Sequence, residues 1–261
     1  MHADLIDDLK SKLQNEADSG KHALYQALPA VLQNVLGNVE YTPGSRFENQ
    51  RLKFMTSVVD FSDRKAIDIG CNLGFFSFSA ISAGASHVTS IEGNTEHATF
   101  VGKAIELLAL NSRMHIKNCY FDFKTFPEKY DIGFLLNVLH HVGDDYGDKN
   151  INMESVKDNI LQELNGMAPH CQRLFFQLGF NWRGNNALPL FDGGTKQEMI
   201  EFIRLGTKGF WKINEVGVAT RKNAGDVIYE AVNNENIKRD DSLGEFLNRP
   251  LFVLESQCFL S

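Results

Sequence analysis

Two acids flank a glycine-containing turn in the stretch AIDIGCNLGFFSFSAISAGASHVTSIEG, which covers residues 66–93. Asp68 stands two residues before Gly70, Gly74 follows, and Glu92, the last residue but one of the stretch, comes just after the next predicted strand. Glycines let a backbone approach a ligand closely where a side chain would collide. In open parallel sheets, ligands bind beyond the carboxyl ends of the strands. The spacing therefore predicts a ligand-binding turn; alternatively, Asp68 only caps the turn and Glu92 is a solvated loop acid.

A dinucleotide does not suit this turn. The pyrophosphate-binding pattern is G-x-G-x-x-G, but counting from Gly70 its second and third glycine positions hold Asn72 and Phe75. The spacing that does hold is D-x-G-x-x-x-G followed by an acid after the second strand, and it resembles the cofactor site of the class I S-adenosylmethionine (SAM)-dependent methyltransferases.

The resemblance implies a role for each residue of the turn. SAM is the expected cofactor and S-adenosylhomocysteine the product. Asp68 lies near the methionine amino group, Gly70, Asn72 and Gly74 bring the backbone to the cofactor, and Glu92 accepts hydrogen bonds from both ribose hydroxyls, a two-point grip that a neutral residue makes less strongly.

Two later segments complete the expected cofactor site. NCYFDF follows the third strand, where this superfamily surrounds the adenine ring, so the resemblance points to Cys119, Tyr120 and Asp122, although Asp122 is equally well a surface turn residue. LLNVLHHV follows the fourth strand, and there the family places Asn137 against the cofactor.

The elements that must position these residues alternate between strand and helix. Strands are predicted at 66–69, 87–91, 114–120, 130–136, 173–178, 210–219 and 251–257, and helices at 75–83, 95–110, 151–167 and 196–205. This order predicts an α/β, doubly wound, Rossmann-like sheet that is mostly parallel, as in the seven-stranded methyltransferase sheet. An N-terminal helical cap precedes it.

The N-terminal cap contains three predicted helices. The first carries an apolar stripe that includes Leu9, the second spans 22–36 and ends at Gly37, and the third begins near Ser45, which has capping-box spacing to Glu48. We expect residues 1–60 to form a helical lid within one domain and 61–261 the methyltransferase core, with a substrate loop around 180–195.

Arg51 lies on the apolar side of the third helix, between Phe47 and Phe54. A charge in that position needs an anion. It is either a snorkelling or ion-paired structural arginine, or a cofactor residue that grips the SAM carboxylate or an anionic substrate.

A closer resemblance covers patches of residues 28–141 and the late segment NRPLFVL. LPAVLQNVLGNVEYTPGSRFENQRL, DIGCNLGFFSFS and DIGFLLNVLHHV are similar to the methyltransferase domain of bacterial O-antigen chain terminators, which methylate a phosphate at the end of a polymannose chain. One position departs: the terminators' tyrosine before the first glutamine is Leu32 here, and Tyr25 is a possible substitute. The terminators' kinase domain and coiled coil are missing from this sequence.

The resemblance implies an O-methyltransferase that acts on a phosphorylated or phosphate-linked carbohydrate in surface-polysaccharide synthesis. A phosphate oxygen needs no general base, only cations such as Arg46, Arg51 and Arg183. A sugar or other hydroxyl needs proton removal, for which His140 or His141 is the candidate base. In the loop FNWRGN, Trp182 is placed to stack on a sugar beside Arg183.

Composition narrows the class of protein. The formal net charge is -7 and there is no long Lys/Arg run, which argues against an RNA methyltransferase, although that alternative stays open together with a non-catalytic SAM-binding protein. The four cysteines lack any C-x-x-C pair, and Asp144, Asp145 and Asp148 form no recognised ligand pattern with the histidines, so no metal is predicted.

An acidic N-terminus and the lack of a long apolar run predict a cytoplasmic protein without a membrane segment; the oligomeric state is not predicted.

Overall fold

The computed structural model describes residues 2–16, 26–39, 41, 46–123, 128–222 and 225–260. The chain divides into two compact units. Unit 1 comprises Met1–Leu52 and Val59–Phe121, and unit 2 comprises Lys53–Val58 and Asp122–Ser261. The expected division into a lid, 1–60, and a core, 61–261, cuts the chain differently and stays a prediction.

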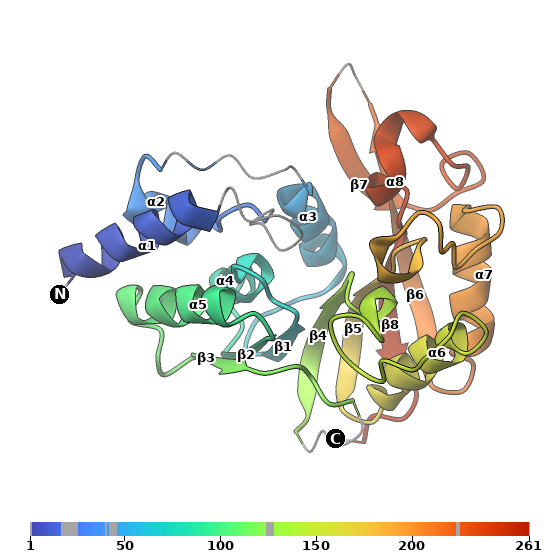
Figure 1. Ribbon diagram of the computed structural model, residues 1–261, viewed down its shortest axis with the longest axis horizontal. Helices are drawn as coiled ribbons and strands as arrows, with labels where there is room; N and C mark the ends of the chain where they lie inside the picture. The colour runs from blue at the N-terminus through green and yellow to red at the C-terminus, as the bar shows by residue number, and fades with distance from the viewer. Residues whose placement is uncertain are drawn as a thin grey trace. The chain divides into compact units, whose positions relative to one another are not determined.

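Unit 1 holds the glycine turn within three parallel strands in the order β3-β2-β1. Helices α4 and α5 pack against these strands, and α1 and α2 lie on the far side of α4 and α5 (Figure 1). The elements are α1 (His2–Glu16), α2 (Ala30–Leu36), the start of α3 (Glu48–Val58), β1 (Lys65–Ile69), α4 (Phe75–Ser82), β2 (His87–Glu92), α5 (Thr95–Leu107) and β3 (Met114–Asn118). Strand β1 is buried over its last four residues, as expected for a parallel strand covered on both faces.

Unit 2 combines one parallel and three antiparallel strand pairs. Its strand order is β4-β5-β8-β6-β7, with β4 and β5 parallel and the remaining neighbours antiparallel. Its elements are β4 (Tyr130–Leu136), η2 (Leu139–His141), α6 (Val156–Gly166), β5 (Cys171–Gln177), η3 (Trp182–Gly184), α7 (Lys196–Gly206), β6 (Trp211–Arg221), β7 (Val227–Ala231), η4 (Asp241–Leu243), α8 (Gly244–Leu247) and β8 (Leu251–Ser256).

Helix α7 shows how the sequence sets one of these elements. Thr195 caps it in a complete capping box, in which the Thr195 side chain accepts from Glu198 N and the Glu198 carboxylate accepts from Thr195 N. At the other end, a Cβ on Gly206 would lie 2.4 Å from the side chain of Leu161 in α6, so glycine permits the close approach of the two helices.

The predicted α/β class with a parallel, Rossmann-like arrangement is confirmed, but the strand count is wrong. The described residues form eight strands, and the additional one is β7, the second strand of an antiparallel hairpin with β6. Its alternating burial, with Val227 and Tyr229 inward, is carried by only five residues beside a turn, which is too weak a periodic signal to stand out in the sequence.

Several helix boundaries also differ from the predicted ones, among them the end of α5, which is Leu107 and not residue 110. Helix α2 begins at Ala30 because Pro29 occupies the position before it, and Gln26 to Pro29 are not helical; residues 22–25 of the predicted helix lie outside the described residues, as does Tyr25. Ser45, the predicted cap of α3, also lies outside them. The helix predicted at 151–167 begins only at Val156.

Candidate functional site

The turn after β1 is built from positive backbone φ angles. Gly70, Asn72 and Gly74 have φ of 72°, 52° and 78°, a region that side chains disfavour. A Cβ on Gly74 would lie 2.9 Å from the ring of Phe78. The backbone N–H groups of Gly70 and Cys71 both donate to Ile91 O, at 2.9 and 3.1 Å, which ties the turn to the end of β2.

Glu92 is held in a fixed orientation by two backbone amides. Its Oε2 accepts from Asn72 N and its Oε1 from Asn94 N, each at 2.8 Å. Every carboxylate oxygen has a second lone pair, so both oxygens keep the capacity to accept from ligand hydroxyls. The predicted ribose acid, at the end of β2, is therefore held against the turn that follows Asp68 and β1.

Asp68 lies at the end of a buried chain of hydroxyls. Its Oδ2 accepts from Ser77 Oγ at 2.7 Å, and Ser77 Oγ accepts from Ser90 Oγ at 2.8 Å. Burial, and secondarily the charge of Glu92, raises the pKa of Asp68 to about 7. A nearby cation such as an ammonium group would stabilise the ionised form.

Asn72 presents a buried acceptor. Its Nδ2 lies 3.3 Å from His97 Nδ1, while Oδ1 has no hydrogen-bond partner among the residues that the structure describes, although the residue is only 6% exposed. An unmade hydrogen bond of this kind costs about 1–3 kcal/mol. A donor from a bound ligand would remove that cost, so the turn fits a polar cofactor such as SAM.

Arg51 is buried against the first turn of α4. It is 4% exposed, its guanidinium lies 5.0 Å above the ring of Phe76, and its Nη2 is 3.9 Å from Glu48 Oε1. Burial raises the pKa of Glu48, an effect opposed by Arg51 and by backbone N–H groups that include Ala27 and Arg46. The sequence thus correctly places a buried cation on α3. Arg46 lies just before that helix and is half-buried.

The predicted adenine segment lies at the carboxyl end of β3. Cys119 and Asp122 are exposed, and Tyr120 is 60% exposed with its ring against Gly93, where a Cβ would lie 2.5 Å from the ring. Gly93 follows Glu92 directly, so the Tyr120 ring and the Glu92 carboxylate belong to one edge of unit 1.

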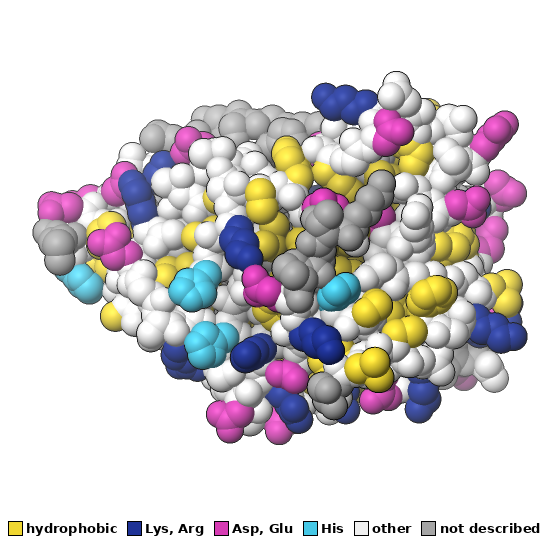
Figure 2. All heavy atoms as spheres, turned by 90° about the horizontal axis from the view of Figure 1, so that it is seen from below, with side chains coloured by type: hydrophobic (Ala, Val, Ile, Leu, Met, Phe, Trp, Pro, Cys, Tyr) yellow, Lys and Arg dark blue, Asp and Glu magenta, His cyan; other side chains and the backbone are white. Residues whose placement is uncertain are grey.

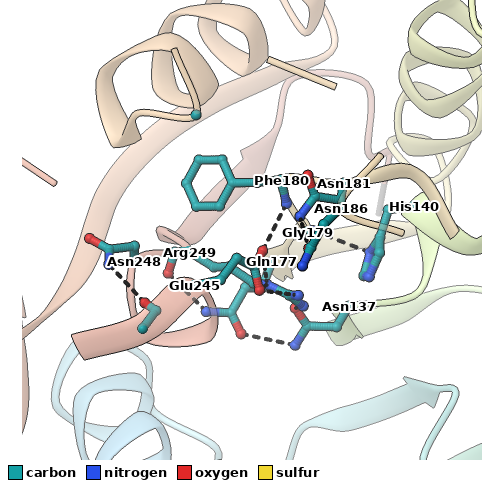
Figure 3. Close-up of polar contacts among 12 residues, drawn as sticks. Asn137, His140, Gln177, Gly179, Phe180, Asn181, Asn186, Glu245, Asn248 and Arg249 are labelled. Carbon is teal, nitrogen blue, oxygen red and sulfur yellow. Dashed lines mark hydrogen bonds and ion pairs between the residues drawn. The ribbon is translucent and has the colours of Figure 1, made fainter. Parts of the chain in front are cut away.

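In unit 2, Asn137 takes part in a closed ring of three hydrogen bonds (Figure 3). Asn137 Nδ2 donates to Gln177 Oε1 at 3.1 Å, Gln177 Nε2 donates to the carbonyl of Arg249 at 3.0 Å, and Arg249 Nη1 donates to Asn137 Oδ1 at 2.8 Å. The ring holds Asn137 at a φ of 62° just after β4. Glu245 lies outside the ring and holds Arg249 in place through an ion pair at 2.6 Å. Glu245 also accepts a hydrogen bond from Phe180 N.

Sequence reasoning missed Gln177, Glu245 and Arg249. Arg249 lies in the segment NRPLFVL, and Glu245 precedes it by one helical turn, a spacing that brings the two side chains together. That spacing is the signal that could have identified the pair.

The two candidate bases occupy different environments. His140 is 2% exposed, and its Nδ1 accepts from Gly179 N at 3.2 Å. Burial, followed by the charges of Arg249 and His141, lowers the pKa of His140 well below its usual value. This placement does not favour His140 as a general base. His141 is half-buried, with Nδ1 3.5 Å from Asp145 Oδ2, and it is the better placed of the two.

Trp182 and Arg183 pack together, and the arrangement does not match the predicted sugar stack. Trp182 is 5% exposed, its Nε1 donates to Val142 O at 2.7 Å, and the Arg183 guanidinium lies 4.2 Å above its ring. Arg183 Nη2 donates to Gly143 O at 2.9 Å, but its Nε has no hydrogen-bond partner within the described part of the chain. Trp182 therefore supports the loop, and Arg183 retains unused donors.

His141, Asp144 and Asp145 bring one imidazole nitrogen and two carboxylate oxygens within 4.8 Å of one another. The sequence did not anticipate this proximity, and the absence of a metal stays a prediction. In the described part of the chain, no helix has both the length and the apolar character to cross a membrane.

Comparison with known proteins defines the class of fold. No protein-family model matches the chain, and no curated protein is detectably similar in sequence. The fold is that of the class I methyltransferases, as seen in solved structures. The chain resembles WbdD, a bifunctional kinase-methyltransferase: 96% of the chain matches 47% of WbdD with a kinase inhibitor at TM-score 0.58 and 16% identity, and 46% of a second WbdD structure at TM-score 0.57 and 17% identity.

The chain thus spans about half the length of the WbdD structures. A further match is magnesium protoporphyrin IX methyltransferase from Synechocystis PCC 6803 with bound SAM, at TM-score 0.49 and 16% identity over 95% of this chain and 98% of that one. At these identities the likeness concerns the fold.

Proposed function

We propose that the protein is a SAM-dependent O-methyltransferase. The observation that carries this proposal is the turn after β1, where Asp68, the buried Asn72 acceptor and the doubly held Glu92 converge. All three offer oxygen acceptors, and SAM carries matching donors in its ammonium group and ribose hydroxyls. When bound, SAM supplies an activated methyl group.

The proposal assigns a role to each candidate cofactor residue of unit 1. Glu92 accepts from the ribose hydroxyls, Asp68 stabilises the ammonium group and Arg51 binds the carboxylate. Tyr120 and Cys119 cover the adenine, while the glycines keep the turn open to the ligand. The proposal also includes a contact between Asn137 and the cofactor, and a cytoplasmic location for the protein.

For the acceptor, we propose a phosphorylated or phosphate-linked carbohydrate in surface-polysaccharide synthesis. Support comes from the sequence resemblance and from Arg183, whose guanidinium has no carboxylate partner among the described residues. A phosphate oxygen is already anionic, so the protein needs to align it and hold its charge. Arg46 is the second candidate cation.

The proximity of His141 to Asp145 favours a second candidate, methylation of a sugar or small-molecule hydroxyl. A carboxylate beside an imidazole can orient the ring for proton removal. RNA remains an alternative acceptor. On the face shown in Figure 2, Lys and Arg side chains are interspersed with Asp and Glu, without a continuous basic stripe.

Two measurements test the proposed function. Calorimetry with S-adenosylhomocysteine should give saturable one-site binding. Transfer of a labelled methyl group from SAM into an extract of cells that make surface polysaccharide should label a phosphate-containing saccharide. Binding without any labelled product would indicate a non-catalytic SAM-binding protein, and label on a hydroxyl or on RNA would replace the proposed acceptor.

A further inference from the structure

Gln26 reaches the first turn of α4 from a segment far earlier in the chain. Its Oε1 accepts a hydrogen bond from the backbone N–H of Phe75 at 3.0 Å, and the residue is only 7% exposed. Phe75 is the first residue of α4, and its N–H has no partner inside the helix. The glutamine therefore caps the helix that follows the glycine turn.

This contact fixes which way the amide of Gln26 faces. A backbone N–H can only donate, so the oxygen of the side chain must point toward Phe75 and the NH₂ group must point away from it. No described residue accepts a hydrogen bond from that NH₂ group. The backbone of Gln26 is held independently, because its carbonyl accepts from Tyr41 Oη at 2.8 Å. A buried side chain thus offers two oriented N–H donors.

A second donor from the same part of the chain meets the same helical turn. The guanidinium of Arg51 lies 5.0 Å from the centroid of the ring of Phe76, the residue after Phe75, and its Nη2 is 3.9 Å from Glu48 Oε1. Amide and guanidinium N–H groups at the start of a helix make a favourable environment for an anion, since the helix N-terminus carries partial positive charge. A carboxylate accepts several such donors at once.

We infer that Gln26 is a ligand-binding residue whose NH₂ group donates to the carboxylate of an amino-acid moiety, alongside Arg51. The inference rests on the proposed function, in which that moiety is the methionine end of the cofactor. Gln26 then has two roles. Its oxygen accepts from the N-terminus of α4, and its nitrogen donates to the ligand carboxylate. Gln26 is then part of the cofactor site and not only a cap of α4.

The variant Gln26→Glu separates these two roles. Glutamate retains an oxygen for Phe75 N–H and is favourable at a helix N-terminus, so the fold should be kept. It replaces the NH₂ donors with an acceptor and places a negative charge near the ligand carboxylate. Two ligands then separate binding of the amino-acid moiety from binding of the nucleoside. S-adenosylhomocysteine carries the amino-acid moiety, and 5′-methylthioadenosine is the corresponding nucleoside without it.

We expect Gln26→Glu to weaken S-adenosylhomocysteine on the order of tenfold or more in calorimetry while changing the affinity for 5′-methylthioadenosine less than about twofold. A melting curve checks that the variant stays folded. Gln14→Glu, which adds the same charge on an exposed position of α1, should change neither affinity.

Three results would count against the inference. Unchanged affinity for S-adenosylhomocysteine makes Gln26 a helix cap only. Equal weakening of both ligands shows that the substitution acts through the turn and not through the carboxylate. A wild-type protein that binds neither ligand overturns the proposed function itself, and with it the ligand assigned to Gln26.

Discussion

The Nδ1 atom of His140 accepts a hydrogen bond from the backbone N–H of Gly179 at 3.2 Å. The imidazole proton must then reside on Nε2, and the ring is held between the segments that follow β4 and β5. A Cβ on Gly179 would lie 2.7 Å from the His140 ring, closer than real Cβ contacts allow. The His140 ring is therefore packed tightly against the backbone of Gly179.

Gly179→Ala should destabilise the protein because the added methyl group collides with a buried ring that cannot move freely. Overpacking of this kind costs about 1–3 kcal/mol, which lowers the melting temperature by several degrees. Gly102→Ala is the matched control, since Gly102 lies inside α5 and its Cβ would find only an ordinary contact at 3.6 Å. That control should be neutral or stabilising by up to about 1 kcal/mol. Equal melting temperatures for the two variants would contradict tight packing of His140 against Gly179.

His141 and Arg183 distinguish the two acceptor classes. For a phosphate acceptor, His141→Gln should leave turnover within about tenfold, whereas Arg183→Met should reduce it by a larger factor, because charge binding and not proton removal limits the reaction. For a hydroxyl acceptor, His141→Gln should lower the rate about 10²–10⁴-fold. Label transfer to the isolated acceptor measures both. If His141→Gln abolishes turnover and Arg183→Met spares it, the phosphate proposal is wrong.

Glu92→Gln should weaken S-adenosylhomocysteine on the order of tenfold. The substitution removes the charge from the hydrogen bonds to the ribose, which are worth about 1.5–3 kcal/mol. Glu96→Gln is the control, because Glu96 is exposed and pairs with Lys12. Calorimetry on folded variants decides the matter, and wild-type affinity in Glu92→Gln would refute the ribose assignment.

Asp68→Asn should make the ligand-free protein more stable at pH 8. The pKa of the Asp68 carboxyl is about 7 in the folded protein because the group is buried, against an ordinary value of 3.8. Between these values folding takes up a proton, so the contribution of Asp68 to stability is complete at low pH and is lost as the pH rises to about 7. A shift of this size corresponds to on the order of 4 kcal/mol, or roughly 5 °C or more in melting temperature.

The same carboxyl should make ligand binding depend on pH. The ligand ammonium group favours ionised Asp68, so the affinity for S-adenosylhomocysteine should fall as the pH drops below about 7. Asp68→Asn should bind more weakly and lose this dependence. Melting curves and calorimetry from pH 5 to 8 test both effects, and an unchanged pH profile in the variant would rule out Asp68 as its source.

The pair Glu48 and Arg51 calls for a double substitution. Arg51→Met alone leaves a buried carboxyl without its cation, a loss that costs about 3–5 kcal/mol when the charge persists. Glu48→Gln with Arg51→Met removes both charges and should recover most of the melting temperature. If Arg51 binds the ligand carboxylate, the double variant should still bind S-adenosylhomocysteine at least about tenfold more weakly. A folded double variant with full affinity and turnover would mean that Arg51 serves packing.

Local patterns in the sequence predicted the elements that carry their own signals. Strand β4 falls at the predicted residues, and Asp68 and Glu92 stand near the carboxyl ends of β1 and β2, where the acid–glycine–acid spacing predicted them, because strand periodicity and turn residues are local properties. The buried position of Arg51 followed from the helical spacing of its apolar neighbours.

Other features depend on contacts between distant residues. Gln26 and Phe75 are far apart in sequence, and nothing around either one indicates that a side chain from one caps the helix of the other. The burial of Trp182 and the tautomer of His140 likewise arise from partners on other segments, Val142 and Gly179. A single sequence records residue types, and these pairings are set by the tertiary fold.

The position of β8 has a consequence for how unit 2 is made. Phe252 in β8 pairs with Phe176 in β5 on one side and with Val216 in β6 on the other. A growing chain that has emerged only as far as β7 therefore exposes two unpaired apolar strand edges at once. Pairing over such long sequence separations is slow, and open edges of this kind promote aggregation. Expression of this protein should therefore be sensitive to translation rate and chaperone supply until β8 inserts.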